Sequence, residues 1–361
     1  MSEHAPGSFA REEIASQGRA WEQVIPLVTQ QADGIRRLFS RADHIVCSGC
    51  GSGLNVAHCA ASLLQMQTGI PAHAAPAADV YLFPTEAIPS KGNTLGVFFS
   101  RSGKTTETLR AARQLRALGM STLAVTSDAS SPLASESDLC LALAPLQEQA
   151  VITTRSLTGM ILAAQVVAAI ASGDAAYLEN LNRLPGLCQA RMQAFQAQGQ
   201  QLGRCGDLQR YVFLGNGPFY GLAREGQLKL KEMAQPPCDA YHMLDFRHGP
   251  QSTVDEHTLV VAFVSDSGYG QEVEFLRDMR ALGGLTWAVC ERANDALRSN
   301  ATYLLELHSG LSELERLPLC LPAVQYMAYH RSLELGFDPD YPHNLTHWID
   351  TSNHSGPRPS V

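Results

Sequence analysis

Apolar runs of strand length alternate with longer helical patterns along the chain. His44 to Ser48 is such a run. It ends in the loop Gly49-Cys50-Gly51-Ser52-Gly53, which a helical pattern from Leu54 to Met66 follows. The unit returns at Leu95 to Phe99, where the run meets Ser100-Arg101-Ser102-Gly103-Lys104-Thr105 and a second helical pattern. Because strands that alternate with helices form a parallel sheet covered on both faces, the pattern predicts an α/β fold.

The second half of the chain repeats this order. Tyr211 to Leu214 meets Gly215-Asn216-Gly217, and Leu259 to Val264 meets Ser265-Asp266-Ser267-Gly268. The two Ser-x-Ser-Gly loops lie 165 positions apart, and an Arg-Ala-Leu-Gly segment recurs at an offset of 164. A nearly constant offset indicates a duplication. We expect two domains of one kind, each a parallel-sheet three-layer αβα sandwich of the flavodoxin-like type.

The repeats divide the chain into four parts. We expect an N-terminal helical segment over 1–34, a first domain over 35–190, a second over 191–335 and a tail over 336–361 that reaches the functional site. The polar segment from Gln193 to Gly206 is the expected link between the domains. The length of 361 residues agrees with two domains, since a domain usually holds roughly 100 to 150 residues.

Charge and hydropathy exclude several classes of protein. The chain has 27 Lys and Arg against 35 Asp and Glu, and its net charge of -8 argues against binding to nucleic acid or to a membrane surface. The longest apolar stretch, Leu157 to Ala171, is interrupted by Thr158 and Gln165 and is shorter than the roughly 20 residues that cross a bilayer. We expect a buried helix there. Met1 to Phe9 lacks the pattern of a secretory leader, so we expect a cytoplasmic protein.

The cysteines offer a candidate redox or metal site. Cys47 and Cys50 have the CxxC spacing of a redox pair or of half a zinc site, but no second pair of ligands follows at metal spacing. Most of the nine cysteines lie in apolar segments, where a reduced thiol packs as a small hydrophobe. We expect two core thiols near a strand end and no bound metal.

Two loops carry the first candidate chemistry. In a parallel sheet the carboxyl ends of the strands share one edge, so loops 49–53 and 100–105 should face the same cleft. Hydroxyl side chains beside the backbone N–H groups of a helix N-terminus form a phosphate cradle. The alternative is that these residues only cap helices. The candidates are Ser52, Ser100, Ser102, Thr105 and Thr106.

Three better-known motifs do not fit these loops. A P-loop needs a glycine where Phe98 stands, and the dinucleotide fingerprint needs a glycine where Leu54 stands. Gly49-x-Gly51-x-Gly53 also resembles a methyltransferase motif, which typically carries an acidic residue at the position of Cys47. We therefore expect no nucleotide cofactor, and no cofactor of any other kind is predicted.

A second set of candidates lies in the other half of the chain. Lys229 and Glu232 stand three positions apart in a helical pattern, a spacing that also occurs in ordinary surface pairs. Phe246-Arg247-His248-Gly249-Pro250 forms a stiff turn that would hold His248 in place.

These motifs together resemble the tandem sugar isomerase (SIS) domain family. The chain is similar to the isomerase half of glucosamine-6-phosphate synthase, to amino-sugar-phosphate isomerases and deaminases, and to fructosamine-phosphate deglycases. Six motifs stand in family order. They are the SGCGS loop, the SRSGKTTET loop, Thr153-Thr154-Arg155, the LKLKE helix, the RHGP turn and the tail from Asp338 to Leu345.

The resemblance implies a role for each matching residue. Glu232 matches the base that moves a proton between sugar C1 and C2, Lys229 its companion, and His248 the acid/base that opens the sugar ring. In relatives this histidine reaches a neighbouring subunit, which implies a homodimer. A carboxylate can hold a proton on one face of two adjacent carbons, and a histidine exchanges protons near neutrality. The implied substrate-binding residues are Ser52, Ser100, Arg101, Ser102, Thr105 and Thr153.

Three positions depart from the synthase pattern. The first apolar strand begins near residue 44, so we expect no glutaminase domain before it. His347 stands where the synthase has a tail lysine that binds the open-chain ketose, and Asp245 stands where glutamate is usual. We include His347 among the catalytic candidates and expect that the substrate already contains its nitrogen.

The sequence thus predicts an enzyme that acts at C1/C2 of a 6-phosphorylated amino sugar or sugar-amine adduct, as a deaminase or deglycase. A simple aldose-ketose isomerase shares the same enolisation step and stays open as an alternative. A non-catalytic sugar-phosphate sensor is the second alternative. No DNA-binding helix-turn-helix precedes residue 44, and a sensor has no need of Glu232 with His248.

Overall fold

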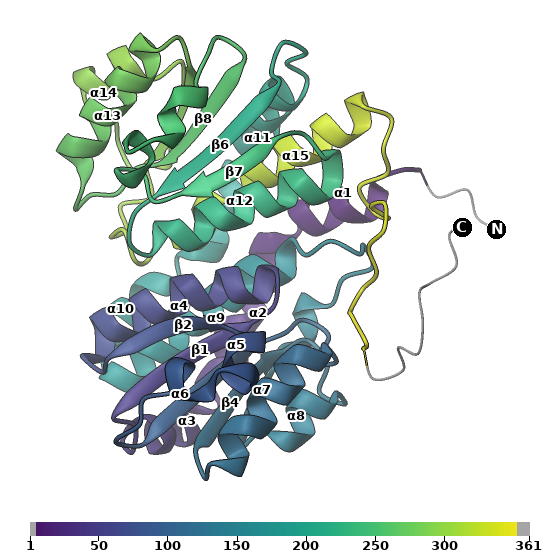
Figure 1. Ribbon diagram of the computed structural model, residues 1–361, viewed down its shortest axis with the longest axis vertical. Coiled ribbons are helices and arrows are strands. Elements are labelled where there is room, and N and C mark those ends of the chain that lie inside the picture. Colours follow the sequence, from purple (N-terminus) through teal and green to yellow (C-terminus); the bar gives the residue numbers. More distant parts are fainter. Residues whose placement is uncertain (1–4, 352–361) are drawn as a thin grey trace.

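Two five-stranded parallel sheets form the framework of the protein. The computed structural model describes residues 5–351 (Figure 1). The first sheet has the order β2-β1-β3-β4-β5, with β1 His44–Gly49, β2 Ala72–Pro76, β3 Thr94–Phe99, β4 Ser121–Thr126 and β5 Leu139–Ala142. The second has the order β10-β9-β8-β6-β7, with β6 Arg210–Gly215, β7 Cys238–Tyr241, β8 Thr258–Phe263, β9 Leu285–Cys290 and β10 Tyr303–Glu306.

Both sheets have one topology. Numbered within its own domain, each sheet has the strand order 2-1-3-4-5, which is the flavodoxin-like order, and every pair of neighbouring strands is parallel. The predicted duplication and the predicted fold class are therefore confirmed. The order of the strands reverses between β1 and β3 in the first domain, and a ligand site in this fold usually lies at that point.

Alternate residues of each strand enter different cores. In β1, Ile45 and Cys47 belong to a large core that also receives Phe213 and Val261 from the second sheet. Val46 lies between them and points to a separate core on the other face of its sheet. One continuous layer of helices therefore lies between the two sheets, and each sheet has a further layer outside it.

The helices fall into these layers. The inner layer contains α2 Gln17–Thr29, α4 Ser52–Thr68, α9 Arg155–Ser172, α11 Leu184–Gly203, α12 Phe219–Ala234 and α15 Pro322–Glu334. The outer layer of the first domain contains α5 Ala77–Leu82, α6 Pro84–Ala87, α7 Thr106–Ala117 and α8 Pro132–Glu136, and that of the second contains α13 Tyr269–Ala281 and α14 Asp295–Asn300. The remaining helices are α1 Ser8–Ala15, α3 Ala32–Phe39 and α10 Ala175–Leu181.

The most apolar helix, α9, belongs to the core. It is long and apolar enough to span a membrane, but 83% of its length is buried inside the protein. The two polar residues that interrupt it find buried partners: Gln165 donates to the carbonyls of Leu314 and Glu315, and Thr158 donates to Gln17 at 2.6 Å. The prediction of a buried helix over this stretch is confirmed.

The segment expected to link the domains is helical. The helix α11 spans Leu184–Gly203, so it contains residues 190 and 191, where the predicted domains meet, and it packs against both α2 and α15. The N-terminal helices extend to Phe39, where α3 ends.

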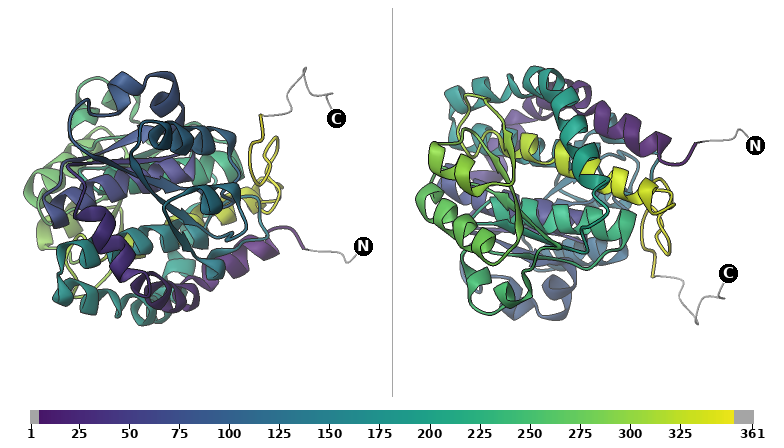
Figure 2. Two further views of the ribbon diagram at one scale, coloured as in Figure 1. Left: turned by 90° about the horizontal axis from the view of Figure 1, so that it is seen from below. Right: turned by 90° about the horizontal axis from the view of Figure 1, so that it is seen from above.

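The tail runs along the edge of both domains and then turns toward the first (Figures 1 and 2). It lies beside α1, whose first turn it caps: the Asp340 carboxylate accepts the N–H groups of Phe9 at 3.1 Å and Ala10 at 2.7 Å. A carboxylate is favoured at a helix N-terminus, where unpaired N–H groups and the helix dipole carry positive charge. This anchor directs the following residues toward the loops after β1 and β3.

Candidate active site

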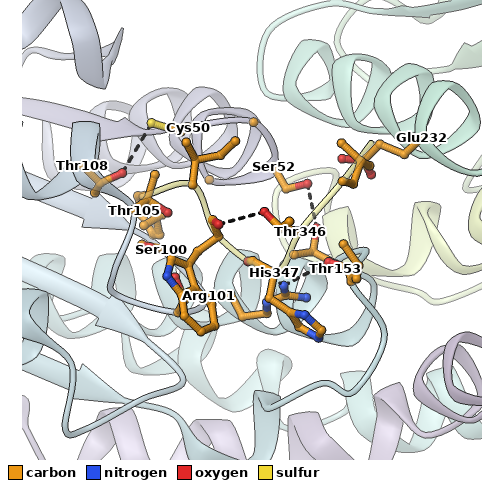
Figure 3. Close-up of a pocket in the computed structure, with 18 of the residues that line it drawn as sticks. Cys50, Ser52, Ser100, Arg101, Thr105, Thr108, Thr153, Glu232, Thr346 and His347 are labelled. Atoms are coloured by element: carbon orange, nitrogen blue, oxygen red, sulfur yellow. Dashed lines mark hydrogen bonds between the residues drawn. The ribbon is translucent and has the colours of Figure 1, made fainter. Parts of the chain in front are cut away.

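A pocket opens at the carboxyl ends of β1 and β3, where the strand order reverses (Figure 3). Its volume is about 220 Å³. One helix of the second domain and the tail complete the walls that the first domain begins. The residues predicted from the sequence that line it are Ser52, Ser100, Arg101, Ser102, Thr105, Thr153, Glu232 and His347.

The loop after β1 brings the N-terminus of α4 close to β3. A Cβ atom on Gly53 would lie 2.3 Å from the carbonyl oxygen of Phe99, so only glycine allows this approach. Ser52, the first residue of α4, is thereby placed on the pocket wall.

The loop after β3 is folded by its own hydroxyl groups. Ser100 Oγ accepts the N–H of Gly103 at 3.1 Å, and Ser102 Oγ accepts that of Lys104 at 3.2 Å. Neither hydroxyl donates a hydrogen bond to another residue within 5–351. Thr105 occupies the N-cap position of α7, but within the described chain its side chain makes no capping hydrogen bond. Its hydroxyl is therefore free for a ligand at the N-terminus of α7.

Arg101 lines the pocket but its terminal nitrogens already have partners. Nη1 donates to the carbonyls of Ala150 and Ile152, while Nη2 donates to those of Val151 and His347, at 3.0 to 3.2 Å. Nη1 also contacts the buried Glu148 carboxylate at 3.3 Å. The guanidinium thus ties the loop after β3 to segment 150–152 and to the tail. This geometry favours a positioning role over the substrate contact that the resemblance implies.

Two further residues of this loop contact other parts of the chain. The Thr106 hydroxyl accepts the N–H of Thr351 at 3.0 Å, so this candidate from the sequence serves the tail rather than the pocket. The Lys104 ammonium lies 2.9 Å from Asp128 and 5.2 Å from the centre of the Trp348 ring. Its charge is balanced outside the pocket.

Lys229 on α12 is at the centre of a buried polar network. Its Nζ donates to Glu232, lies 3.4 Å from Oε1 of Glu225, and donates to Thr153 Oγ1 at 3.2 Å. The Thr153 hydroxyl donates to Ser52 Oγ at 2.7 Å, and Ser52 donates to Glu225 at 3.1 Å. These contacts close a ring that joins the hydroxyls of the first domain to the charged groups of the second, and Figure 3 shows Ser52, Thr153 and Glu232 on one side of the pocket.

Burial and charge act in opposite directions on this network. Burial alone would lower the pKa of Lys229, but the carboxylates of Glu232 and Glu225 outweigh it and hold the pKa above its ordinary value. Burial raises the pKa of Glu225, with repulsion from Glu232 in the same direction and attraction to Lys229 opposed. Lys229 is thus a permanent cation beside Glu232, whose side chain is 20% exposed and reaches the pocket.

Sequence reasoning missed two members of the network. Glu225 is fully buried, and Asn55 on α4 donates to its Oε2 at 2.9 Å. The signal for Glu225 was present, because it stands four positions before Lys229 on one face of a helix. Asn55 had no such signal, since its contact depends on how α4 packs against α12.

His248 does not meet these residues within one chain. It follows the short 3₁₀ helix Asp245–Arg247, it is exposed, and it is not among the residues that line the pocket. Gly249 turns the chain sharply after it with φ of 132°.

His347 reaches the pocket from the tail. Its Nε2 lies 3.0 Å from the carbonyl oxygen of Gln149 and must therefore carry a hydrogen. In the neutral ring Nδ1 is then the acceptor. The backbone carbonyl of the same residue accepts from Arg101, so the position of the ring depends on both contacts.

The CxxC pair is part of the strand and loop after it. Cys47 is buried in β1, and burial raises the pKa of its thiol; burial also raises the pKa of Cys50, whose Sγ lies 3.5 Å from Thr108 Oγ1. Neither is a ready thiolate. Among residues 5–351, no group of three His, Cys, Asp or Glu could hold a metal ion.

The fold and the site define a tandem α/β protein. Hydroxyl groups of the first domain line its pocket together with Glu232 of the second domain, which pairs with Lys229. The SIS domain family matches residues 38–169 and 207–329, and the chain belongs to this family. Its identification from six sequence motifs is confirmed.

Relatives of known name support the same family. A glutamine–fructose-6-phosphate aminotransferase (isomerizing) of Methanothermobacter thermautotrophicus is 25% identical over 327 residues, 90% of this chain and 53% of that protein. The Pseudomonas aeruginosa protein of that name is 28% identical over 323 residues, 85% of this chain and 52% of that one. The chain therefore spans about half the length of these curated relatives.

Solved structures share the fold over nearly the whole chain. The C-terminal domain of the Francisella tularensis glucosamine-fructose-6-phosphate aminotransferase is 22% identical with a TM-score of 0.80, covering 95% of this chain and 100% of that one. Tagatose-6-phosphate ketose/aldose isomerase of Escherichia coli is 23% identical with a TM-score of 0.84, covering 94% and 97%. Glucosamine-6-phosphate deaminase of Thermotoga maritima is 24% identical with a TM-score of 0.70, covering 91% and 99%.

Proposed function

We propose that this protein is an enzyme that acts at C1/C2 of a 6-phosphorylated amino sugar or sugar-amine adduct, as a deaminase or deglycase. The observation that carries the proposal is the junction of two kinds of group in one pocket. Hydroxyls at a helix N-terminus face it from the first domain, and Glu232, which pairs with the buried Lys229, faces it from the second.

The phosphate would bind at the loop after β3. Thr105 and the hydroxyl hydrogens of Ser100 and Ser102 lie where α7 begins, and the N-terminus of a helix favours an anion. Ser52 and Thr153 lie between this end of the pocket and Glu232. We expect them to contact sugar hydroxyls.

Glu232 would act as the base at the other end. Its carboxylate takes the proton from one of the two carbons, C1 or C2, and returns it to the other, with an enediol or enolamine between the two steps. Lys229 would hold the Glu232 carboxylate in position through its contacts with Glu232 and Thr153. A non-catalytic sensor would have no use for a buried cation beside a carboxylate that reaches the pocket.

The proposed reaction also uses two residues outside the Lys229–Glu232 pair. His248 would open the sugar ring, and its distance from the pocket in the single chain fits the prediction that it enters the site of a second subunit in a homodimer. His347, as a neutral ring with Nδ1 as acceptor, would accept a hydrogen bond from the substrate nitrogen.

A simple aldose-ketose isomerase is the second candidate, since it uses the same enolisation. His347 favours the nitrogen-bearing substrate, because it replaces the lysine that the synthase pattern uses toward a ketose. The relatives include proteins named for both reactions, an isomerase and a deaminase.

The test is to incubate the protein with 6-phosphorylated amino sugars, their Amadori adducts with amines, and the corresponding ketose phosphates, and to assay free amine and aldose-ketose conversion. The proposal expects amine release from at least one nitrogen-bearing compound. Conversion of ketose to aldose without amine release from any compound would favour the second candidate, and no conversion at all would contradict both.

The phosphate site has its own test by calorimetric titration. Ser102→Ala with Thr105→Ala should weaken a sugar phosphate by a few kcal/mol, since each hydrogen bond to a charged group contributes roughly 1.5 to 3 kcal/mol. The unphosphorylated sugar should bind poorly to both forms. Equal affinity of wild type and double variant for the phosphorylated ligand would refute the placement of the phosphate.

A further inference from the structure

The second domain contains a copy of the phosphate loop that the proposed reaction does not use. Ser265-Asp266-Ser267-Gly268 follows β8 as Ser100 to Gly103 follows β3, at the offset of 165 positions. The two loops also fold alike: Ser265 Oγ accepts the N–H of Gly268 at 2.8 Å, as Ser100 accepts that of Gly103. The second loop therefore keeps the two serines and the backbone fold of the first, although Gly270 stands at the position of Thr105.

A side chain of the protein itself fills this second loop. The Glu313 carboxylate accepts the N–H groups of Asp266 at 2.8 Å and Ser267 at 3.0 Å, and it also accepts the Ser267 hydroxyl at 2.5 Å. In the first domain the matching N–H groups of Arg101 and Ser102 make no hydrogen bond to the described part of the chain. The carboxylate thus has the contacts that an oxyanion would make.

The first domain has a glutamate at the matching position but uses it elsewhere. Glu148 stands 165 positions before Glu313, and its carboxylate accepts the N–H groups of Thr154 at 2.8 Å and Ser156 at 3.0 Å at the start of α9. Arg101 contacts it at 3.3 Å. That carboxylate is therefore held away from the first loop, which stays open.

The charge at one loop position differs between the domains and explains the two outcomes. Asp266 stands where the first domain has Arg101, and it cannot attract a carboxylate as Arg101 attracts Glu148. It pairs instead with the buried Arg316, with two contacts of 2.7 Å. This ion pair holds the segment that carries Glu313 against the loop.

The first domain also holds this segment in place. Gln165 on α9 donates to the carbonyls of Leu314 and Glu315, and Asn180 on α10 donates to the Glu315 carboxylate at 2.8 Å. Glu313 is thus kept over the second loop by the contacts of Leu314, Glu315 and Arg316, the three residues that follow it.

We propose that Glu313 is an internal substitute for a phosphate group, which closes the oxyanion loop of the second domain and restricts phosphate binding to the first. The proposal goes beyond the reaction proposed above, because it concerns a loop outside that pocket. It explains how a duplicated protein keeps one site per chain although both halves retain the Ser-x-Ser-Gly loop.

Chemical rescue of Glu313→Ala tests the proposal. The variant leaves two N–H groups and a hydroxyl without their acceptor, so its melting temperature should fall by roughly 2 to 6 °C. Sodium formate, which supplies a carboxylate of the lost size, should restore at least half of that loss, whereas sodium chloride at the same ionic strength should not. Glu274→Ala removes the same charge from an exposed position of α13 and should show neither the loss nor the rescue. Loss without rescue by formate or inorganic phosphate, or equal rescue of Glu274→Ala, would overturn the proposal.

Binding stoichiometry gives a second test that leaves Glu313 unchanged. Titration of the wild type with a 6-phosphorylated sugar should show one site per chain, and Ser102→Ala with Thr105→Ala should remove it. Two sites of similar affinity in the wild type would contradict the role of Glu313. A wild type that binds no such sugar would count against the proposed function, while the formate experiment would still decide the role of Glu313.

Discussion

Substitution of Lys229 by methionine removes the one cation that lies between two carboxylates of the site. Its Nζ is 3.4 Å from Oε1 of Glu225 and contacts Glu232, and the lysine is fully buried. At an effective dielectric constant of about 20, opposite charges at this separation attract by roughly 5 kcal/mol before desolvation is counted. Removal of one partner of a buried pair costs at most about 3 to 5 kcal/mol, the full cost being reached when the other partner stays charged. Burial raises the pKa of Glu225 to about 7, so this carboxyl can take up a proton and reduce the cost.

Lys229→Met should therefore lower the free energy of unfolding by up to about 3 to 5 kcal/mol, as measured by scanning calorimetry at neutral pH and above. The deficit should shrink as the pH falls, because the Glu225 carboxyl, whose pKa burial raises, can then take up a proton. Glu225→Gln combined with Lys229→Met should be more stable than Lys229→Met alone, since the amide removes the unpaired charge.

The control is Lys231→Met, an exposed position of the same helix, which should change stability by less than about 0.5 kcal/mol. A loss below about 1 kcal/mol for Lys229→Met would refute the buried charge network. So would a double variant whose loss equals the sum of the two single losses, because the residues would then act independently.

Three further predictions concern the surroundings of the pocket. Burial, with repulsion from Glu148, raises the pKa of Glu13 from 4.5 to about 7. The stability that protonated Glu13 contributes is therefore lost as the pH rises from about 4.5 to 7. Glu13→Gln should flatten that part of the curve of melting temperature against pH, and an unchanged slope would contradict this role. Arg101→Lys should raise KM and expose the tail to faster proteolysis, because an ammonium cannot serve four carbonyls at once; unchanged KM and cleavage would show that these contacts do not hold the tail. His347→Lys should raise KM for nitrogen-bearing substrates more than for a ketose phosphate, and an equal change for both would remove the support for a substrate amine.

The sequence predicted the fold because its signals are local and repeated. Short apolar runs before loops such as Gly49 to Gly53 specify parallel strands, and the offset between the two Ser-x-Ser-Gly loops specifies the duplication. The hydroxyls of the loops after β1 and β3 that line the pocket follow from the strand order, which brings these two loops together.

Contacts between distant segments could not be predicted in the same way. The sequence places Arg101 beside the phosphate loop, but only the packed chain shows that four carbonyls occupy its guanidinium. Glu148 and Glu313 stand at matching positions but accept hydrogen bonds from different partners. The difference follows from one loop position, which holds Arg101 in the first domain and Asp266 in the second.

The proposed transfer of a proton by Glu232 between C1 and C2 of a phosphosugar can be measured directly through the exchange of that proton with water. A substrate deuterated at C2 should lose its label to water during turnover by the wild type. Glu232→Gln keeps the size of the side chain but removes the base, so turnover and label loss should both fall by a factor of about 10² to 10⁴ while calorimetric affinity for the substrate persists. Glu274→Gln, at an exposed site, should behave as the wild type. Undiminished turnover and exchange in Glu232→Gln would contradict the account.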